Sequence, residues 1–232
     1  MKSTIENLLY CPLDMETPPT DFLDHLNNLK LEKLYTDNYR NCYHVPIMYD
    51  TIPNKFSWMP FAFPYKSLRE WLEDVLFPIT GKSRVMIITT PPGVENPPHI
   101  DCSKDKFQNT LQHKFRYVLQ GNIDDLVFMS KSGDVRCNQG PDTPFVMSGS
   151  WPHYMQNRSD TTKFTLALGA PWDGDLRNES YVNLVSNSYK KYKSYYQSFE
   201  NLQLPENWED LFEEKYDFRK KADHFLQKKI SR

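Results

Sequence analysis

Three residues of this 232-residue chain have the types and spacing of ligands for a divalent metal ion. His99 and Asp101 form an H-x-D sequence at the start of a predicted strand, and His153 begins a second strand-like run. Residues i and i+2 of a strand point to the same face, so an imidazole nitrogen and a carboxylate can meet at one point. Two histidines and one carboxylate make the facial triad that holds non-haem Fe(II) and leaves coordination positions open. The spacing therefore predicts a metal site of this type.

Lys163, ten residues after His153, adds a cation to a strand that we expect to run beside the metal site. A buried cation is unfavourable unless it meets an anion. A dicarboxylate ligand with one end on the metal would supply that anion at its other end. Thr165 follows on the same strand face and could donate its hydroxyl. Arg116, in the strand after the H-x-D loop, could bind a carboxylate of co-substrate or substrate through two parallel hydrogen bonds.

Each of these residues also has a purely structural explanation. An H-x-D sequence often lies in a turn that is closed by a local side-chain bond. His153 alone would be an ordinary core or surface histidine, Lys163 a strand lysine whose ammonium reaches solvent, and Arg116 half of a structural ion pair. The combination of all of them in one β-rich region favours the metal site.

The β-rich region covers about residues 83–172 and contains all of these candidates. Apolar and β-branched runs separated by turn residues predict strands at 84–90, 114–120, 126–129, 143–147, 153–156 and 163–168. Short strands at such intervals are typical of a sandwich or a barrel. The 17 prolines and only 8 glycines of the chain disfavour a long helical bundle and a glycine-rich nucleotide fold.

The segments on either side are expected to support this region. Helical spacing predicts helices at 21–30 and 67–77, the second ending at Pro78. Proline-interrupted strands are predicted at 43–49 and 56–63. Residues 178–232 are charged and predict helices, one of them beginning at Pro205.

Composition limits the partners and the compartment. The chain has 28 Lys and Arg against 30 Asp and Glu, a net charge of -2, so nucleic acid is not an expected partner. No apolar run approaches the ~18 residues of a membrane-spanning helix, and no membrane partner is expected. The four cysteines form no C-x-x-C pair. These features predict a cytoplasmic protein with reduced thiols.

The candidate site resembles a known enzyme superfamily. His99-x-Asp101, His153 and Lys163 together resemble the Fe(II)- and 2-oxoglutarate-dependent dioxygenases, whose core is a double-stranded β-helix, or jelly roll. Segments 86–93, 116–119 and 150–157 are similar to the aspartyl/asparaginyl β-hydroxylase-like branch. A lysine at the tenth position after the second histidine is closer to the prolyl 4-hydroxylase pattern. The resemblance covers about residues 83–172.

The resemblance implies a fold, a site and an activity. The fold would be mainly β with flanking helices: residues 81–175 as the jelly-roll catalytic core, 1–80 as its N-terminal support and 176–232 as a helical extension, all in one structural domain. Fe(II) would bind to His99, Asp101 and His153, and the co-substrate 2-oxoglutarate would be held through Lys163, with ascorbate as a possible additional cofactor. The activity would be hydroxylation of an amino-acid residue or a small molecule by dioxygen, with release of succinate and carbon dioxide.

Two other hypotheses remain open at this point. One is a cupin-like metal protein that isomerises or binds a small ligand without using oxygen; it would leave Lys163 without a partner. The other is a non-catalytic jelly-roll adaptor whose working surface is the C-terminal helices. Those helices would also be the element through which a homodimer forms.

Overall fold

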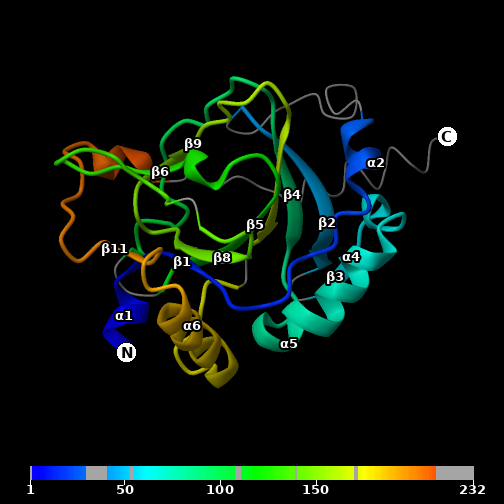
Figure 1. Ribbon diagram of the computed structural model, residues 1–232, viewed down its shortest axis with the longest axis horizontal. Coiled ribbons are helices and arrows are strands. Elements are labelled where there is room, and N and C mark those ends of the chain that lie inside the picture. The colour runs from blue at the N-terminus through cyan, green and yellow to red at the C-terminus, as the bar shows by residue number, and fades with distance from the viewer. Residues whose placement is uncertain are drawn as a thin grey trace.

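The computed structural model describes residues 2–29, 41–52, 55–107, 111–138, 140–169 and 172–212. Within these residues the chain is mainly β, and its strands form two antiparallel sheets (Figure 1). The large sheet has the order β11-β1-β8-β5-β10-β4-β2-β3, and the small sheet has the order β7-β6-β9. The predicted fold class, mainly β with flanking helices around a jelly-roll core, is confirmed.

All six strands predicted for the β-rich region form. They are β4 (Val85–Thr90), β5 (His113–Gln120), β6 (Leu126–Phe128), β8 (Phe145–Ser148), β9 (His153–Met155) and β10 (Lys163–Leu168). The two strands predicted before this region appear as β2 (Tyr43–Ile52) and β3 (Lys55–Trp58), the second of them shorter than predicted. Three strands were not predicted: β1 (Leu8–Pro12), β7 (Val135–Arg136) and β11 (Gln197–Ser198). Because β1 pairs with β8 and β11 pairs with β1, both terminal zones extend the large sheet.

The helices are short except for one. They are α1 (Lys2–Glu6), α2 (Leu23–Asn27), η1 (Pro60–Ala62), α4 (Lys66–Trp71), η2 (Leu72–Leu76), α5 (Phe77–Thr80), η3 (Ile123–Asp125), α6 (Glu179–Lys191) and η4 (Trp208–Leu211). The prediction that a helix ends at Pro78 was wrong. η2 is a π-helical turn, and Pro78 lies in the first turn of α5, where its missing N–H group would have no helical partner.

The C-terminal helix predicted from Pro205 is only partly tested. The 3-10 turn η4 (Trp208–Leu211) is the helical structure in this part of the described chain. Residues 213–232 lie outside the described residues.

The large sheet buries both of its faces. Phe164, Leu166 and Leu168 of β10 join the main hydrophobic core with residues of α4, η2 and α6. A second cluster, which includes Leu126, Phe128 and Met147, lies between the large sheet and the small one. Figure 1 shows α4, α5 and α6 on one side of the large sheet and β6 and β9 on the other.

This arrangement decides which side chains of β5 and β10 face the small sheet. Phe115, Tyr117 and Leu119 of β5 pack in the main core. Because side chains alternate along a strand, Arg116 points to the opposite face, and so do Lys163 and Thr165 of β10. Arg116 is in register with Ala167, and Thr165 with Val118, so these residues share one face of neighbouring strands.

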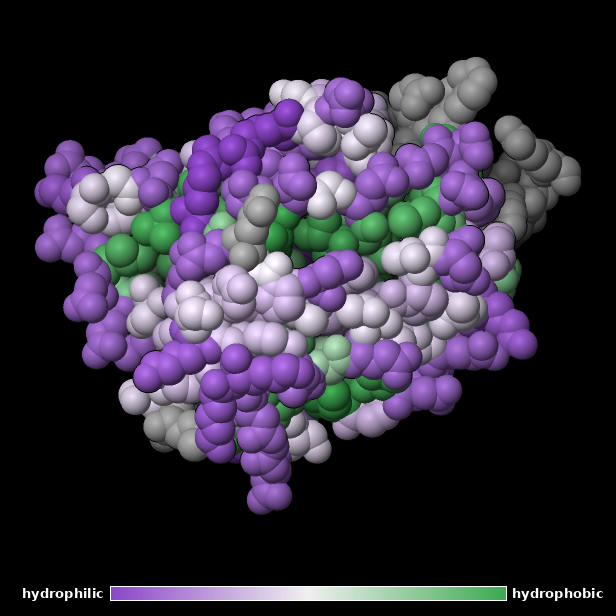
Figure 2. All heavy atoms as spheres, in the orientation of Figure 1, coloured by the Kyte–Doolittle hydropathy of each residue, from purple (hydrophilic) through white to green (hydrophobic). Residues whose placement is uncertain are grey.

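The surface is mixed in character. On the face drawn in Figure 2, hydrophobic side chains form a band across the molecule between hydrophilic ones. Among the described residues, no helix combines the length and the apolar composition needed to cross a membrane.

Candidate metal centre

The structure brings the three predicted metal ligands together. One ligand atom each of His99, Asp101 and His153 lies within 4.8 Å of the other two. The Asp101 carboxylate is 3.5 Å from Nε2 of His99 through Oδ1 and 3.6 Å from Nε2 of His153 through Oδ2. Both histidines are buried, and the Asp101 side chain is 15% exposed. The site is therefore enclosed but remains accessible on the side of the carboxylate.

Backbone pairing fixes the two ligand-bearing segments to each other. His99 and His153 form an antiparallel bridge in which each N–H group donates to the other's carbonyl, at 2.9 and 3.0 Å. The N–H group of Asp101 donates to the carbonyl of Gly149 at 2.7 Å. Residues that are about 50 positions apart in the sequence thus become neighbours across one short ladder.

The hydrogen bonds of the imidazoles determine which nitrogen is available to a metal. Nδ1 of His99 lies 2.8 Å from the carbonyl oxygen of Pro97, and Nδ1 of His153 lies 2.8 Å from that of Trp151. A carbonyl oxygen only accepts, so in each ring Nδ1 is the protonated nitrogen and Nε2 keeps its lone pair. Both lone-pair nitrogens are therefore the ones next to the Asp101 carboxylate, which is the second-shell arrangement of metal-binding histidines.

This donor set suits Fe(II). Two neutral imidazole nitrogens and one carboxylate on one side of a point are the ligands of non-haem iron sites with open positions. Two donors that are each ~2.1 Å from one ion can be at most ~4.2 Å apart. Both separations from Asp101 satisfy this limit, and the three donor atoms together lie within 4.8 Å of one another, which is close to it.

Arg116 lies beside the triad. Its Nη2 atom is 3.6 Å from Oδ2 of Asp101, and its Nη1 atom donates to the carbonyl oxygens of Phe115 and Leu168 at 2.9 and 3.0 Å. The guanidinium is thus held in a fixed orientation by its own sheet. It places a permanent positive charge next to the metal ligands.

Lys163 has a partner that the sequence analysis missed. Its ammonium donates to the carbonyl of Asn122 and lies 3.2 Å from the carboxylate of Asp125, and both charged side chains are buried. Burial lowers the pKa of Lys163, and the Asp125 carboxylate opposes this effect. Asp125 also accepts a hydrogen bond from Arg158 at 3.0 Å. A carboxylate of the protein thus meets the lysine for which we expected a carboxylate of a bound ligand.

Thr165 offers a hydroxyl to the same interior face. The residue is completely buried, and within the described part of the chain its Oγ1 atom has no hydrogen-bond partner. A buried polar atom without a partner costs free energy, so this hydroxyl would gain from a bound polar ligand. It lies on β10, one strand away from Arg116.

Comparison with solved structures gives distant matches. The chain is similar to a prolyl hydroxylase from Trichoplax adhaerens solved with a hypoxia inducible factor peptide. The identity is 11% over 77% of this chain and 89% of that one, with a TM-score of 0.44. It is also similar to an oxidoreductase of the 2OG-Fe(II) oxygenase family from Burkholderia pseudomallei, with 13% identity over 64% of this chain and 75% of that one and a TM-score of 0.41.

A third similar structure is the viral collagen prolyl hydroxylase of Paramecium Bursaria Chlorella virus-1 in its 2OG complex. The identity is 13% over 70% of this chain and 96% of that one, with a TM-score of 0.38. No family model matches the sequence, and no curated protein does. The chain is thus structurally similar to 2OG-Fe(II) oxygenases and prolyl hydroxylases, and it has a His-Asp-His triad that fits a facial iron site.

Proposed function

We propose that this protein is an Fe(II)- and 2-oxoglutarate-dependent dioxygenase that hydroxylates an amino-acid residue or a small molecule. The observation that carries the proposal is the convergence of Nε2 of His99, Nε2 of His153 and the carboxylate of Asp101, with both Nδ1 atoms bonded to backbone carbonyls. Residues that served only the core would have no reason to present three donors to one point.

Each residue of the site has a role in the proposed reaction. When bound, Fe(II) and 2-oxoglutarate would supply the chemistry by which dioxygen oxidises two partners: one oxygen atom would enter the substrate as a hydroxyl group, and the other would enter succinate as 2-oxoglutarate loses carbon dioxide. His99, Asp101 and His153 would hold the metal and contribute a single negative charge. Fe(II) in this ligand set would keep a net positive charge, which favours an anionic co-substrate.

Arg116 and Thr165 are suited to orient that co-substrate. Arg116 would donate to one carboxylate from its position beside Asp101, and Thr165 would donate its buried hydroxyl from the neighbouring strand. Lys163 adds positive charge to the same face, although it shares that charge with Asp125. His99 and His153 are buried, which limits the access of water to the metal from their side.

The ion pair between Lys163 and Asp125 favours a second candidate function. A cupin-like metal protein that binds or isomerises a small ligand needs no dicarboxylate, and Asp125 supplies the partner that this hypothesis would otherwise lack. Such a protein would retain a metal ion at the triad and would not consume 2-oxoglutarate.

Release of succinate separates the two functions. Purified protein is supplied with Fe(II), 2-oxoglutarate, ascorbate and a panel of amino acids, peptides and nucleosides. The dioxygenase proposal predicts iron-dependent succinate that rises with one class of substrate and that Asp101→Ala abolishes. Iron retention without succinate would support the cupin-like protein. An Asp101→Ala variant that retains iron and releases succinate as the wild type does would overturn both metal-based functions.

A further inference from the structure

Residues 199–212, which follow β11, run past the metal site and end beside the H-x-D segment. We call them the C-terminal strap. Figure 1 shows the strap in orange, from β11 to the vicinity of β6. The N–H group of Lys131 donates to the carbonyl of Gln203 at 3.0 Å, and the Lys131 ammonium lies 3.1 Å from the carboxylate of Glu206. The middle of the strap is thus attached to the chain that follows β6.

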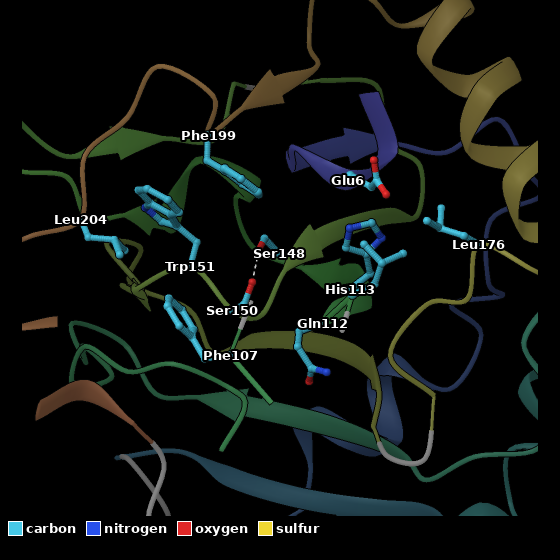
Figure 3. A pocket seen from close by; sticks show the side chains of 11 residues that line it. Glu6, Phe107, Gln112, His113, Ser148, Ser150, Trp151, Leu176, Phe199 and Leu204 are labelled. Carbon is cyan, nitrogen blue, oxygen red and sulfur yellow. Dashed lines mark hydrogen bonds between the residues drawn. The ribbon is translucent and has the colours of Figure 1, made fainter. Parts of the chain in front are cut away.

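The beginning of the strap packs beside a residue that orients His153. Phe199 stacks on Trp151 with the ring centroids 5.3 Å apart and the planes 12° from parallel. The carbonyl of Trp151 accepts the bond from Nδ1 of His153 at 2.8 Å. Figure 3 shows Phe199 and Leu204 of the strap around Trp151, where they line a cavity of about 470 Å³ together with Phe107. The strap therefore contacts the wall of the metal site on the side of His153.

The end of the strap is bonded between the other two metal ligands. The N–H group of Ile100 donates to the carbonyl of Leu211 at 2.7 Å, and Ile100 forms a parallel bridge with Phe212. The N–H groups of the flanking ligands, His99 and Asp101, donate to carbonyls at the start of β9 and just after β8. Three consecutive N–H groups thus fix the H-x-D segment to three parts of the chain, and the strap supplies the middle acceptor.

An aromatic cluster fastens the loop after the H-x-D segment to the strap. Phe107 stacks on Trp208 with the ring centroids 4.7 Å apart, and Phe212 packs edge-on against these two rings at 5.4 and 5.7 Å. The Lys104 ammonium lies 2.6 Å from the carboxylate of Glu209, and both side chains are exposed. Aromatic pairs in these geometries stabilise beyond the area that they bury, whereas an exposed ion pair contributes little. The three rings are therefore the main contact between the loop and the strap.

We propose that the C-terminal strap positions His99 and Asp101 for the metal, and that Trp208 is the positioning residue that keeps the strap docked. Trp208 acts through Phe107 and Phe212. The first belongs to the loop that continues from Asp101, and the second bridges the H-x-D segment. The inference rests on the proposed function, because it concerns the metal site of that enzyme.

Docking of the strap and binding of the metal are then coupled equilibria. The metal binds the arrangement in which its ligands are in place, so its apparent dissociation constant rises as the docked fraction of the protein falls. A docked fraction of one in ten raises this constant about tenfold. Coupling of this kind is reciprocal, so a bound metal also favours the docked strap.

Anaerobic titration with Fe(II) tests the first consequence. We expect Trp208→Ala to bind Fe(II) about tenfold more weakly than the wild type, as is typical when a residue that orients metal ligands is lost. Trp208→Phe keeps an aromatic ring against Phe107 and should recover most of the affinity. Trp58→Ala removes another half-buried tryptophan, which packs against Phe77, and should leave the affinity unchanged. Wild-type affinity in Trp208→Ala would overturn the proposal, and so would an equal loss in Trp58→Ala.

Hydrogen exchange of the wild type tests the second consequence and needs no variant. We expect Fe(II) under anaerobic conditions to slow amide exchange in peptides that cover residues 99–107 and in those that cover residues 199–212. Peptides from β3 should exchange at the same rate with and without the metal. Protection of residues 99–107 without protection of the strap would show that the strap is not coupled to the metal, and the proposal would fail.

The outcomes separate this inference from the proposed function. Wild-type protein that binds no Fe(II) would overturn both. Wild-type protein that binds Fe(II), with Trp208→Ala binding it equally well, would overturn the inference alone. Protein whose strap is coupled to the metal but that releases no succinate would overturn the proposed dioxygenase alone.

Discussion

The two cationic residues on the face of the triad, Arg116 and Lys163, have different partners. Arg116 is held by backbone carbonyls and faces Asp101, whereas Lys163 is engaged with the buried carboxylate of Asp125. Arg116 keeps a positive charge beside the metal ligands. Lys163 neutralises the buried carboxylate of Asp125 in the space between the two sheets.

Arg116→Gln tests the proposed contact between Arg116 and the co-substrate. The variant replaces the guanidinium with a shorter, neutral amide that still donates hydrogen bonds. The 2-oxoglutarate concentration for half-maximal succinate release should therefore rise about 10- to 100-fold, as expected for one charged hydrogen bond. Iron binding should persist, because the three ligands are unchanged. A titration with 2-oxoglutarate measures the effect, and an unchanged requirement would remove Arg116 from the co-substrate site.

Lys163→Met tests the contribution of the ion pair between Lys163 and Asp125 to stability. The variant leaves Asp125 buried beside Arg158 without the lysine, and breaking a buried ion pair costs about 3–5 kcal/mol. Urea unfolding should show a loss in this range, and Lys163→Met combined with Asp125→Leu should recover much of it. If stability is unchanged and only the 2-oxoglutarate requirement rises, Lys163 holds the co-substrate after all.

The contact between β5 and α6 is made by a buried histidine that is neutral near pH 7. His113 begins β5, and its ring bonds to Tyr181 of α6 in a fully buried position. Burial lowers the pKa of His113 to about 4, below its value of 6.5 in an unfolded chain. His113 and Tyr181, 68 residues apart, thus join a β-strand to a helix through an imidazole that burial keeps uncharged near pH 7.

The pH dependence of stability follows from this shift. Because the folded-state pKa is lowered, the unfolded chain takes up the proton first as the pH falls. The contribution of His113 is then fully present above about pH 6.5 and is lost as the pH falls towards 4, by up to about 3 kcal/mol. Urea midpoints at pH 7.5 and 4.5 measure this loss. The difference should shrink in His113→Gln, and an equal loss in both proteins would exclude His113 as its cause.

Some features of the folded molecule follow from short sequence patterns, and others depend on segments that are far apart in the sequence. The strands of the β-rich region and the triad were predictable, because alternation and the H-x-D spacing are local signals. β1 and β11 were not, since their pairing joins residues that are far apart in the sequence, such as Leu8 and Ser198, which are 190 positions apart. Asp125 as the partner of Lys163 was also missed, and so was the cavity of about 470 Å³ that is lined by Trp151, Phe199 and His113. Both arise where segments distant in sequence meet in the folded chain.

The triad exists only in the folded molecule, since the small sheet supplies His153 and the segment before β5 supplies His99 and Asp101. A metal that binds the folded chain alone should therefore stabilise it, by an amount that grows with the logarithm of the metal concentration above its Kd. Fe(II) should raise the thermal unfolding midpoint of the wild type under anaerobic conditions. It should leave that of His153→Ala unchanged.

An anaerobic equilibrium titration with Fe(II) shows whether His99, Asp101 and His153 form an iron site. We expect one bound Fe(II) per chain for the wild type and for His25→Ala, which alters an exposed histidine outside the triad. We expect loss of that binding in His99→Ala, Asp101→Ala and His153→Ala. Wild-type protein that binds no Fe(II), or triad variants that bind it as well as the wild type, would show that the triad is not an iron site.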